Sequence, residues 1–461
     1  MTHQVKRRPL PNVTPTVALH TREKAEEFVA RVKSSGYEYL RFEFPDTAGL
    51  SRGKTVPVNH IAGYMVTGLN FYGGTVALDS YSIPVKNSGY NEERNYTDCV
   101  LIADTETLSP VPWLEKTGRV ICDTMWYDGV AQFAAPRMLL KKMLLVADEL
   151  GFSMKSGHEY EFYVVEEETR KPLYSGQPIF ATAKTHQFEA IDSLIRVLGA
   201  QDIDIITYNA EHGPAQLEIN YSALDGIAAA DRAFVFKGTV KEYLLKHGIL
   251  ATFMTKPYKG LSGSCSHFHV SLIDKKTGDN AFYDPDAPHG MSDTCRSFVQ
   301  GVLDHATAAM AIWNPTPNCY RRIRPATYAP SNISWGVQDR TASVRVKATG
   351  DADTHIEVRM PSAVSNPYLV AASTLAAGLR GIVEGRELKE AAAGPKEDEE
   401  GYEKLPTEIG QALDALERDI ELRETLGEEF IRVYVATKRQ EMARLRDEIP
   451  QAEIDEYFEL Y

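Results

Sequence analysis

The chain has 461 residues, of which 43% are apolar and 25% are charged. This composition is typical of a folded globular protein with more than one domain, and it excludes bulk disorder and collagen-like repeats. The formal net charge of −14 argues against nucleic acid or an anionic membrane as a partner.

The cysteines and the N-terminus indicate a cytoplasmic protein. Five cysteines are scattered along the chain without a C-x-x-C pair, so we expect reduced thiols rather than a disulfide framework or a cysteine zinc site. No apolar run follows the basic N-terminal residues, and no stretch reaches the roughly 18–20 apolar residues of a membrane helix. We therefore expect a soluble protein without a secretory signal.

The first part of the chain is predicted to form a small strand-rich domain with one helix. Residues 1–16 are polar and Pro-rich and indicate a flexible tail, and the domain is expected over residues 17–130. Apolar residues that recur on one face predict a helix over 21–34. Alternating or apolar runs predict strands at 37–44, 54–56, 101–103 and 119–122.

A larger domain is predicted over residues 131–461. Pro136 at a favoured helix start and Gly151 after its end predict a helix over 136–150. Strands are expected at 159–165, 214–221, 266–273, 341–347 and 355–360. Helices are expected at 186–199, 226–247, 292–312, 366–384 and 407–446. The segment 390–404 is predicted to be an exposed loop.

Acidic residues lie on two of the expected strands. Glu159 and Glu161 are two apart, so they project from the same face, and such a pair is commonly neutralised by a divalent metal ion. Glu211 lies in a Gly/Pro turn, and Glu218 lies on the strand that follows it, where Gln216 shares its face and is expected to orient it. The alternative is that these are solvated edge or turn residues.

Two histidines follow a loop of small residues. The segment Gly260–Ser266 leads directly into a strand on which His267, His269 and Ser271 share one face. Backbone amides of such a loop approach phosphate or carboxylate closely, and imidazole binds a metal ion or phosphate. A lone histidine is more often structural, but two on one face after this loop favour a functional site.

Basic residues cluster near the C-terminal strands in spite of the acidic composition. Arg322 lies in a run with two further arginines, Arg340 and Arg345 bracket a short strand, and Glu357 and Arg359 share one strand face. Arginine is the preferred forked donor for carboxylate and phosphate. Ordinary surface or cross-strand ion pairs are the alternative for each of them.

The order of these motifs resembles the glutamine synthetase superfamily. The motifs are G-x-E-x-E-F, E-x6-E, G-S-x-x-H-x-H-x-S, N-P-x-x-N-x-Y-R-R, R-x-A-S-x-R and I-E-V-R-x-P, and the resemblance covers the chain from about residue 37 to its end. It implies an α+β fold, with an N-terminal β-grasp domain and a catalytic domain built on a curved antiparallel sheet flanked by helices. It also implies hexameric rings, stacked as dodecamers, in which one N-terminal domain closes the next subunit's site.

The resemblance further implies ATP and two or more Mg²⁺ or Mn²⁺ ions per site. The implied metal ligands are Glu159, Glu161, Glu211, Glu218, His267 and Glu357. The implied ATP contacts are His269, Ser271, Arg340 and Arg345. The implied glutamate contacts are Gly263, Arg322 and Arg359. Catalysis is expected to depend on Glu211, His269 and Arg340, since positioned cations stabilise a transferring phosphoryl group.

The sequence departs from the family at two positions that bind ammonium. Tyr72 stands where glutamine synthetases carry an Asp, and Tyr328 stands where they carry a Glu on a flap. Ser262 also replaces the usual Asn beside Gly263. Two phenols remove two negative charges and supply aromatic walls for an organic group. The departures resemble the γ-glutamylamide ligase branch and favour an apolar monoamine, such as an alkylamine or aniline, as the nucleophile.

Two other functions remain open from the sequence. A true glutamine synthetase would bind ammonia through other residues. A non-catalytic regulatory or assembly protein is a different class, but it has no need of the buried charges of six metal ligands. The sequence names neither the amine nor the metal.

Overall fold

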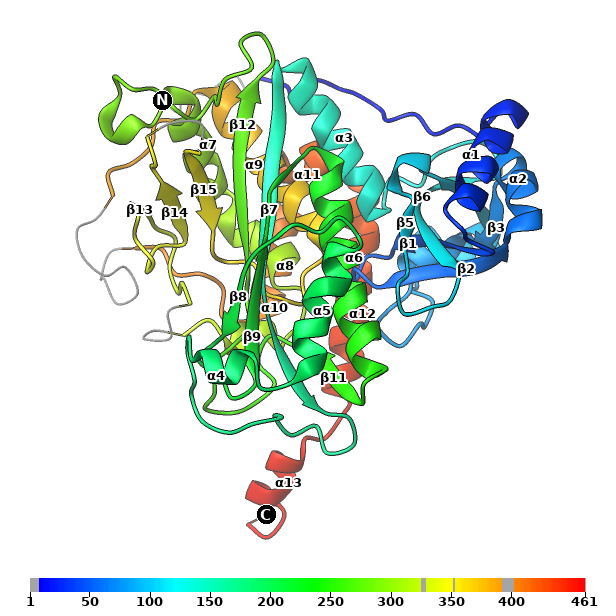
Figure 1. Cartoon of the computed structure of the whole chain (residues 1–461). Coiled ribbons are helices and arrows are strands. Elements are labelled where there is room, and N and C mark those ends of the chain that lie inside the picture. Colours follow the sequence, from blue (N-terminus) through cyan, green and yellow to red (C-terminus); the bar gives the residue numbers. More distant parts are fainter. Residues whose placement is uncertain (1–7, 325–328, 351–352, 392–401, 461) are drawn as a thin grey trace.

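The computed structural model in Figure 1 has an α+β architecture with two sheets, as expected. It describes residues 8–324, 329–350, 353–391 and 402–460. Part of the predicted tail, part of the predicted loop 390–404 and Tyr328 therefore lie outside the described residues. No helix in the described ranges is long and apolar enough to cross a membrane. All five cysteines are buried and free.

The smaller sheet lies at one side of the molecule and runs in the order β2-β1-β6-β4-β3, with β5 paired to β6. Its strands are β1 (Tyr39–Pro45), β2 (Ser51–Pro57), β3 (Leu69–Tyr72), β4 (Asp98–Ala103), β5 (Ser109–Pro110) and β6 (Thr117–Trp126). Two helices cover it, α1 (Arg22–Ser34) and α2 (Val58–Thr67). The prediction of a single helix here was wrong, because the short α2 buries only Ile61 and Met65 and leaves little periodicity to detect.

The larger sheet runs in the order β13-β14-β15-β12-β7-β9-β8, and β10 and β11 also pair with β7. All these pairs are antiparallel except β13 with β14. The strands are β7 (Phe152–Glu166), β8 (Ile205–Ala210), β9 (Gln216–Tyr221), β10 (Leu224–Asp225), β11 (Ile249–Thr252), β12 (Ser266–Asp274), β13 (Trp335–Val337), β14 (Val344–Lys347) and β15 (His355–Val358). The long β7 lies at the centre of this sheet.

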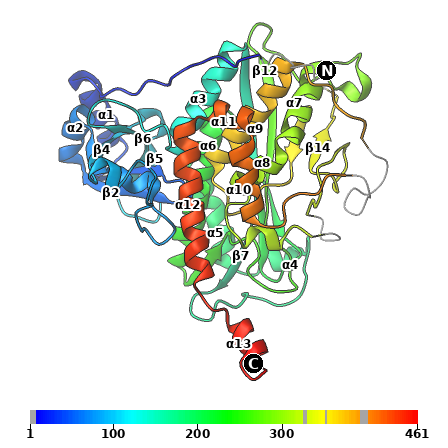
Figure 2. The same cartoon turned by 180° about the vertical axis from the view of Figure 1, so that it is seen from behind.

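Helices pack over one face of the larger sheet (Figure 2). They are α3 (Pro136–Glu149), α5 (Glu189–Gly199), α6 (Ile227–Leu245), α7 (Asp293–Asp304), α8 (Ala306–Trp313), α9 (Pro367–Glu384), α10 (Ile409–Arg418), α11 (Ile420–Leu426) and α12 (Glu428–Arg446). The short α4 (Thr182–Thr185) contacts β8, and α13 (Gln451–Tyr457) extends away from the sheet and has no buried residue. Short 3₁₀ turns lie at Gly73–Ala77, Glu92–Arg94, Thr105–Thr107, Pro288–Gly290 and Cys319–Arg321. The inward faces of these helices and of β7 and β12 form one apolar core.

Two predicted long helices are broken, and the breaks meet each other. The helix expected over 292–312 is interrupted at His305, and the one expected over 407–446 is first interrupted at Asp419. Asp419 caps α11 by accepting from the amide of Leu422, and its other carboxylate oxygen lies 2.6 Å from Nδ1 of the buried His305. A long-range ion pair thus fixes both breaks, and periodicity within either segment does not reveal it.

This ion pair predicts a pH-dependent stability. Burial lowers the pKa of His305, but hydrogen bonds with Asp419 and Glu421 outweigh burial and raise the pKa from 6.5 to about 9, with Arg386 as an opposing charge. A raised folded-state pKa contributes stability that is complete below about pH 6.5 and is lost as the pH rises through about 9.

We expect His305→Gln to be less stable than the wild type by on the order of 3 kcal/mol at pH 6, with a difference that shrinks above pH 9. Urea unfolding of both proteins from pH 6 to pH 10 measures this difference. A difference that stays constant over the whole range contradicts the role of the charged imidazole.

Candidate active site

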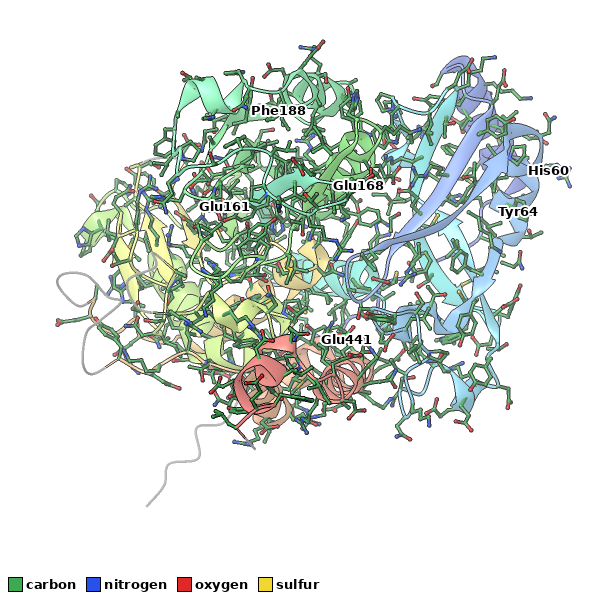
Figure 3. All side chains as sticks on the ribbon, turned by 90° about the horizontal axis from the view of Figure 1, so that it is seen from below. His60, Tyr64, Glu161, Glu168, Phe188 and Glu441 are labelled. Carbon is green, nitrogen blue, oxygen red and sulfur yellow. The ribbon has the colours of Figure 1, made fainter. Side chains whose placement is uncertain are left out.

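A cavity of about 2590 Å³ lies against the larger sheet and is lined by most of the residues that the sequence predicted. Residues alternate along β7, so Tyr160 and Phe162 point into the core while Glu159 and Glu161 line the cavity. The predicted residues that line it are Glu159, Glu161, Glu211, Glu218, Gly263, His267, Arg322, Arg340, Arg345, Glu357 and Arg359. Figure 3 shows Glu161 inside the larger part of the molecule, far from His60 and Tyr64 of α2.

Strand register brings these side chains together from distant parts of the sequence. On either side of β7, Glu161 is paired with Glu218 of β9, and Glu159 is paired with His267 of β12. Glu357 of β15 lies across from positions on β12 and β14. Directly opposed residues on one sheet face have Cβ atoms about 4.5–5.5 Å apart, so the register alone assembles the cluster.

The first group combines two carboxylates with an imidazole. Nδ1 of His267 lies 3.0 Å from Glu159 and 3.3 Å from Glu357. Burial raises the pKa of Glu159, but hydrogen bonds with His267 and His269 outweigh it and lower the pKa overall. Burial also raises the pKa of Glu357, but the charges of His267 and Arg359 outweigh burial and lower this pKa to about 2. Both carboxylates are therefore held in the charged form.

The second group is acidic and has no cation of its own. Glu161, Glu211 and Glu218 line the cavity, and none of them has an ion pair with a basic residue of the described chain. Burial and the charge of Glu211 raise the pKa of Glu161 to about 7. Burial and the neighbouring carboxylates raise the pKa of Glu218 to about 9. These side chains repel one another as the protein stands.

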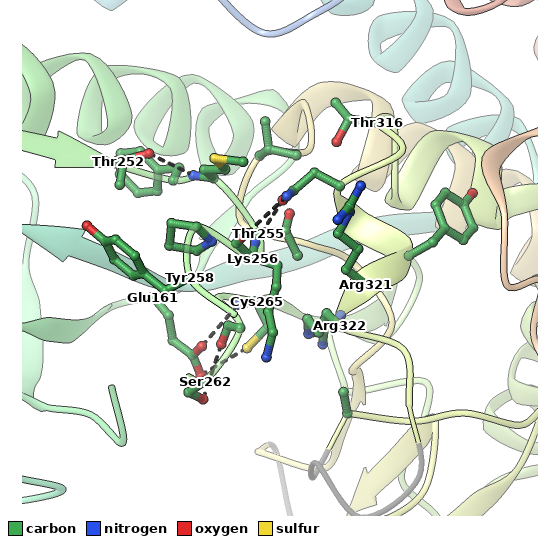
Figure 4. A pocket seen from close by; sticks show the side chains of 18 of the residues that line it. Glu161, Thr252, Thr255, Lys256, Tyr258, Ser262, Cys265, Thr316, Arg321 and Arg322 are labelled. Carbon is green, nitrogen blue, oxygen red and sulfur yellow. Dashed lines mark hydrogen bonds between the residues drawn. The ribbon is translucent and has the colours of Figure 1, made fainter. Parts of the chain in front are cut away.

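Arginines surround the other side of the cavity. Arg345 donates to one oxygen of Glu357 at 3.0 Å, and Arg359 donates to the other at 2.6 Å. The buried Arg322 donates to the carbonyls of Arg359 and Met360 at 2.9 and 3.2 Å. Figure 4 shows Arg322 and Arg321 near the loop that carries Ser262 and Cys265. Arg340 is exposed to the cavity.

Gln216 holds the glycine loop rather than Glu218, which corrects the sequence-based expectation. Its amide nitrogen lies 3.1 Å from the carbonyl of Gly263, 3.1 Å from the hydroxyl of Ser264 and 3.3 Å from Glu161. Strand alternation correctly places Gln216 and Glu218 on one face of β9. The side-chain amide of Gln216, however, bonds to the loop that precedes β12. Glu218 instead accepts from Asn220 at 3.0 Å.

Three predicted residues do not line the cavity, and one is not described. His269 lies behind its edge, 3.5 Å from Glu159 and 3.1 Å from His355. Ser271 is buried farther along β12. Tyr72 ends β3 in the smaller sheet, where its hydroxyl bonds Asn91. Tyr328 lies outside the described residues.

Sequence reasoning missed three residues of this site. The thiol of Cys265 lies 3.1 Å from both Glu161 and His267, and burial raises its pKa well above the usual range. Ile179 and Phe180 line the cavity together with Glu211, and they are 37% and 66% exposed. The amide of Phe180 donates to the carbonyl of Ala210 at 2.9 Å, beside Glu211. No motif marks these residues, since only the folded loop brings them to the cavity.

The donor set fits divalent metal ions of the Mg²⁺ or Mn²⁺ kind. As the side chains stand, the described residues contain no group of three or more His, Cys, Asp or Glu arranged as a metal site. The carboxylates Glu159 and Glu357 bond instead to His267 and to arginines. Carboxylate oxygens with one imidazole are suitable ligands, and a cation between the mutually repelling acids would remove their repulsion.

Comparisons with known proteins agree with this geometry. Residues 133–457 match the family described as "Glutamine synthetase, catalytic domain". The glutamine synthetase of Thermus thermophilus is 31% identical over 94% of this chain and 99% of its own length. That of Methanocaldococcus jannaschii is 32% identical over 94% of this chain and 97% of its own length.

Solved structures show the same fold. A GmaS/ADP complex superposes with a TM-score of 0.84 and 29% identity, over 94% of this chain and 99% of that one. A structure described as a novel glutamine synthase homolog has a TM-score of 0.79 over 92% of this chain and 99% of that one. At 24% identity, the latter likeness concerns the fold alone.

The repulsion within the acidic group predicts that neutralising one of its carboxylates raises the melting temperature of the metal-free protein. The same change should reduce the further rise in melting temperature that added metal produces. In EDTA at pH 7, we expect Glu218→Gln to raise the melting temperature by about 2 °C, because the folded wild type must protonate Glu218 to relieve the repulsion, whereas glutamine is already neutral. Added Mn²⁺ should raise the melting temperature of the wild type and much less that of the variant. Glu168→Gln, at an exposed position just beyond β7, is the matched control and should behave as the wild type. Equal Mn²⁺ shifts in all three proteins would rule out Glu218 as a metal ligand.

Proposed function

Because this chain belongs to the glutamine synthetase family, which carries out ATP-dependent ligation, we propose that it joins the γ-carboxylate of glutamate to an organic amine. The reaction proceeds through γ-glutamyl phosphate and gives a γ-glutamylamide, ADP and phosphate. Enzymes of this family use ATP, divalent metal ions, glutamate and a nitrogen donor, and they are oligomeric. An apolar monoamine is the nucleophile proposed for this chain.

Glutamate is proposed to bind between the arginines and the glycine loop. Arg322 and Arg359 are both buried at the cavity wall, and Gly263 lies across from them. A Cβ atom on Gly263 would come within 3.0 Å of the Arg322 side chain, so only glycine leaves that space open. Arginine forks position a carboxylate well for attack, which supports glutamate as the acyl donor.

ATP is proposed to bind at the adjoining wall, on the other side of Glu357, near Arg340 and Arg345 at the cavity and His269 and Ser271 on β12. The likeness to a GmaS/ADP complex supports an adenine nucleotide in this chain as well. Bound Mg²⁺ or Mn²⁺ would neutralise phosphate charge and orient the phosphoryl group. The residues proposed to hold the metal ions are Glu159, Glu161, Glu211, Glu218, His267 and Glu357.

The amine is proposed to enter beside Glu211, which accepts its proton before or during attack on the acyl phosphate. The observation that carries this proposal is an apolar part of the cavity lining beside the segment that carries Glu211, whose carboxylate accepts from Asn209 and from the amide of His212. Ile179 and Phe180 line the cavity next to this segment, and neither supplies a charge for ammonium. Phe180 also adopts φ +56°, a left-handed conformation that bulky residues rarely take and that strained functional segments often show.

The proposed roles of the two tyrosines involve the oligomer. Tyr72 does not line the cavity of its own chain, so its proposed place in the amine pocket requires Tyr72 of a second subunit. Rings of six subunits, stacked as a dodecamer, are the proposed assembly. Tyr328 is proposed to close the pocket on a flap. With five free cysteines, the cytoplasm is the proposed location.

Ammonia is the second candidate nucleophile, because several curated relatives at 30–32% identity are named glutamine synthetase. The two candidate nucleophiles are distinguished by phosphate release with glutamate and ATP. The kcat/KM for ammonia is compared with the values for methylamine, isopropylamine, ethanolamine, putrescine and aniline. We expect isopropylamine or another apolar monoamine to exceed ammonia. If ammonia exceeds every amine, the protein is a glutamine synthetase with an unusual pocket.

The apolar residues that line the cavity near Glu211 predict that mutating one of them affects an organic amine more than ammonia. We expect Phe180→Ala to lower kcat/KM for isopropylamine about tenfold, since a lost apolar contact in a pocket costs roughly 1–3 kcal/mol. The value for ammonia should change less than about twofold because ammonia has no apolar substituent. Ile206→Ala is the matched control, since Ile206 is a 63% exposed residue of β8 that does not line the cavity. A uniform loss for both nucleophiles would show that Phe180 supports the fold rather than amine selection.

A further inference from the structure

A half-buried lysine of α6, Lys237, lines the cavity and contacts the segment that carries one of the cavity arginines. Nζ of Lys237 donates to the carbonyl of Ala363 at 2.9 Å and to that of Ser365 at 3.0 Å. The rings of Tyr160 and Phe253 lie beneath the ammonium, with centroids at 5.4 and 5.2 Å. Lys237 forms no ion pair with a carboxylate in the described ranges of the chain.

The segment Arg359–Ser365, which we call the clamp segment, is connected to every proposed glutamate contact. It begins with Arg359, and the guanidinium of Arg322 donates to two of its carbonyls. The amide of Ala363 donates to the carbonyl of Ser264, the residue after Gly263, at 3.2 Å. The clamp segment therefore sets the distance between the two arginines and the glycine loop.

The clamp segment is an irregular turn, so its position depends on bonds from outside. The turn is closed by the amide and hydroxyl of Ser365, which both donate to the carbonyl of Ser362. Two carbonyls of this turn point at Lys237, and buried carbonyls need donors. A single ammonium with three N–H groups satisfies both at once, which an uncharged aliphatic side chain does not.

Retaining a cation here is costly, which indicates a specific use. Burial and then the nearby charge of Lys241 lower the pKa of Lys237 to about 7, and Cys319 opposes this. His158 stacks on Tyr160 on the same face of β7, and burial followed by the charge of Lys237 lowers the pKa of its imidazole. A buried charge without a carboxylate partner is otherwise replaced by a packed apolar residue at no loss of stability.

We propose that Lys237 is a positioning residue for glutamate, which it aligns by fixing the carbonyls of Ala363 and Ser365 so that Arg322, Arg359 and Gly263 face the same carboxylates. The inference rests on the proposed function, because it takes these three residues as the glutamate site. Lys237 also lines the cavity, but its proposed effect on glutamate is exerted through these two carbonyls rather than by direct contact. Its loss should let the clamp segment shift and should leave the ATP wall unchanged.

The test compares Lys237→Met with Lys241→Met, one helical turn farther along α6. Lys241 also lines the cavity, but within the described ranges its side chain makes one long hydrogen bond, at 3.4 Å to the carbonyl of Ala251, and none to the clamp segment, so it serves as the matched control. We expect Lys237→Met to raise KM for glutamate at least tenfold while KM for ATP stays within about twofold. Lys241→Met should keep both values. An unchanged glutamate KM, or equal rises for glutamate and ATP, overturns the proposal.

A second measurement on the wild type does not depend on how well the variant folds. Hydrogen exchange should slow on glutamate binding in the clamp segment and in the glycine loop together. Protection of the glycine loop alone would contradict a coupled clamp segment. If the wild type consumes no glutamate at all, the proposed function fails, and this result is distinct from either outcome for Lys237.

Discussion

The mutual repulsion of Glu161, Glu211 and Glu218 is the constraint around which the rest of the site is arranged. The adjacent strands β7 and β9 present Glu161 and Glu218 to the cavity, the turn before β9 presents Glu211, and their raised pKa values reflect the cost. A fold that retains such acids gives up stability that neutral residues would provide. The neighbouring Glu159 and Glu357 are balanced by His267 and by arginines, so the cavity has one compensated side and one side that needs a cation.

The rigid connection between the two sheets limits which residues reach this cavity. The buried Arg137 of α3 bonds Asp104 and Asp123 from the smaller sheet and its edge, and also Asp231 of α6. Removing one member of such a buried network typically costs about 3–5 kcal/mol, so the smaller sheet is held in one place. Tyr72 is thereby kept away from the cavity of its own chain, so its proposed place in an amine pocket requires a neighbouring subunit.

Much of this architecture could be predicted from the sequence, for identifiable reasons. Strand alternation correctly predicted that Glu159 and Glu161 share one face of β7 and that His267 lies on the cavity face of β12. The ordered motifs indicated the family. The breaks at His305 and Asp419, the reach of Gln216 to Gly263 and the approach of Phe180 to Glu211 were not predictable. Each of them depends on contacts between segments far apart in the chain, which neither local periodicity nor a motif encodes.

The central claim is that an organic amine, rather than ammonia, receives the glutamyl group. The most direct measurement is a competition in which the enzyme, glutamate and ATP are supplied with equimolar ¹⁵N-ammonium and isopropylamine, and the products are identified by mass spectrometry. The account predicts that γ-glutamylisopropylamide predominates, with one ADP and one phosphate formed for each product molecule. Predominance of ¹⁵N-glutamine would contradict it.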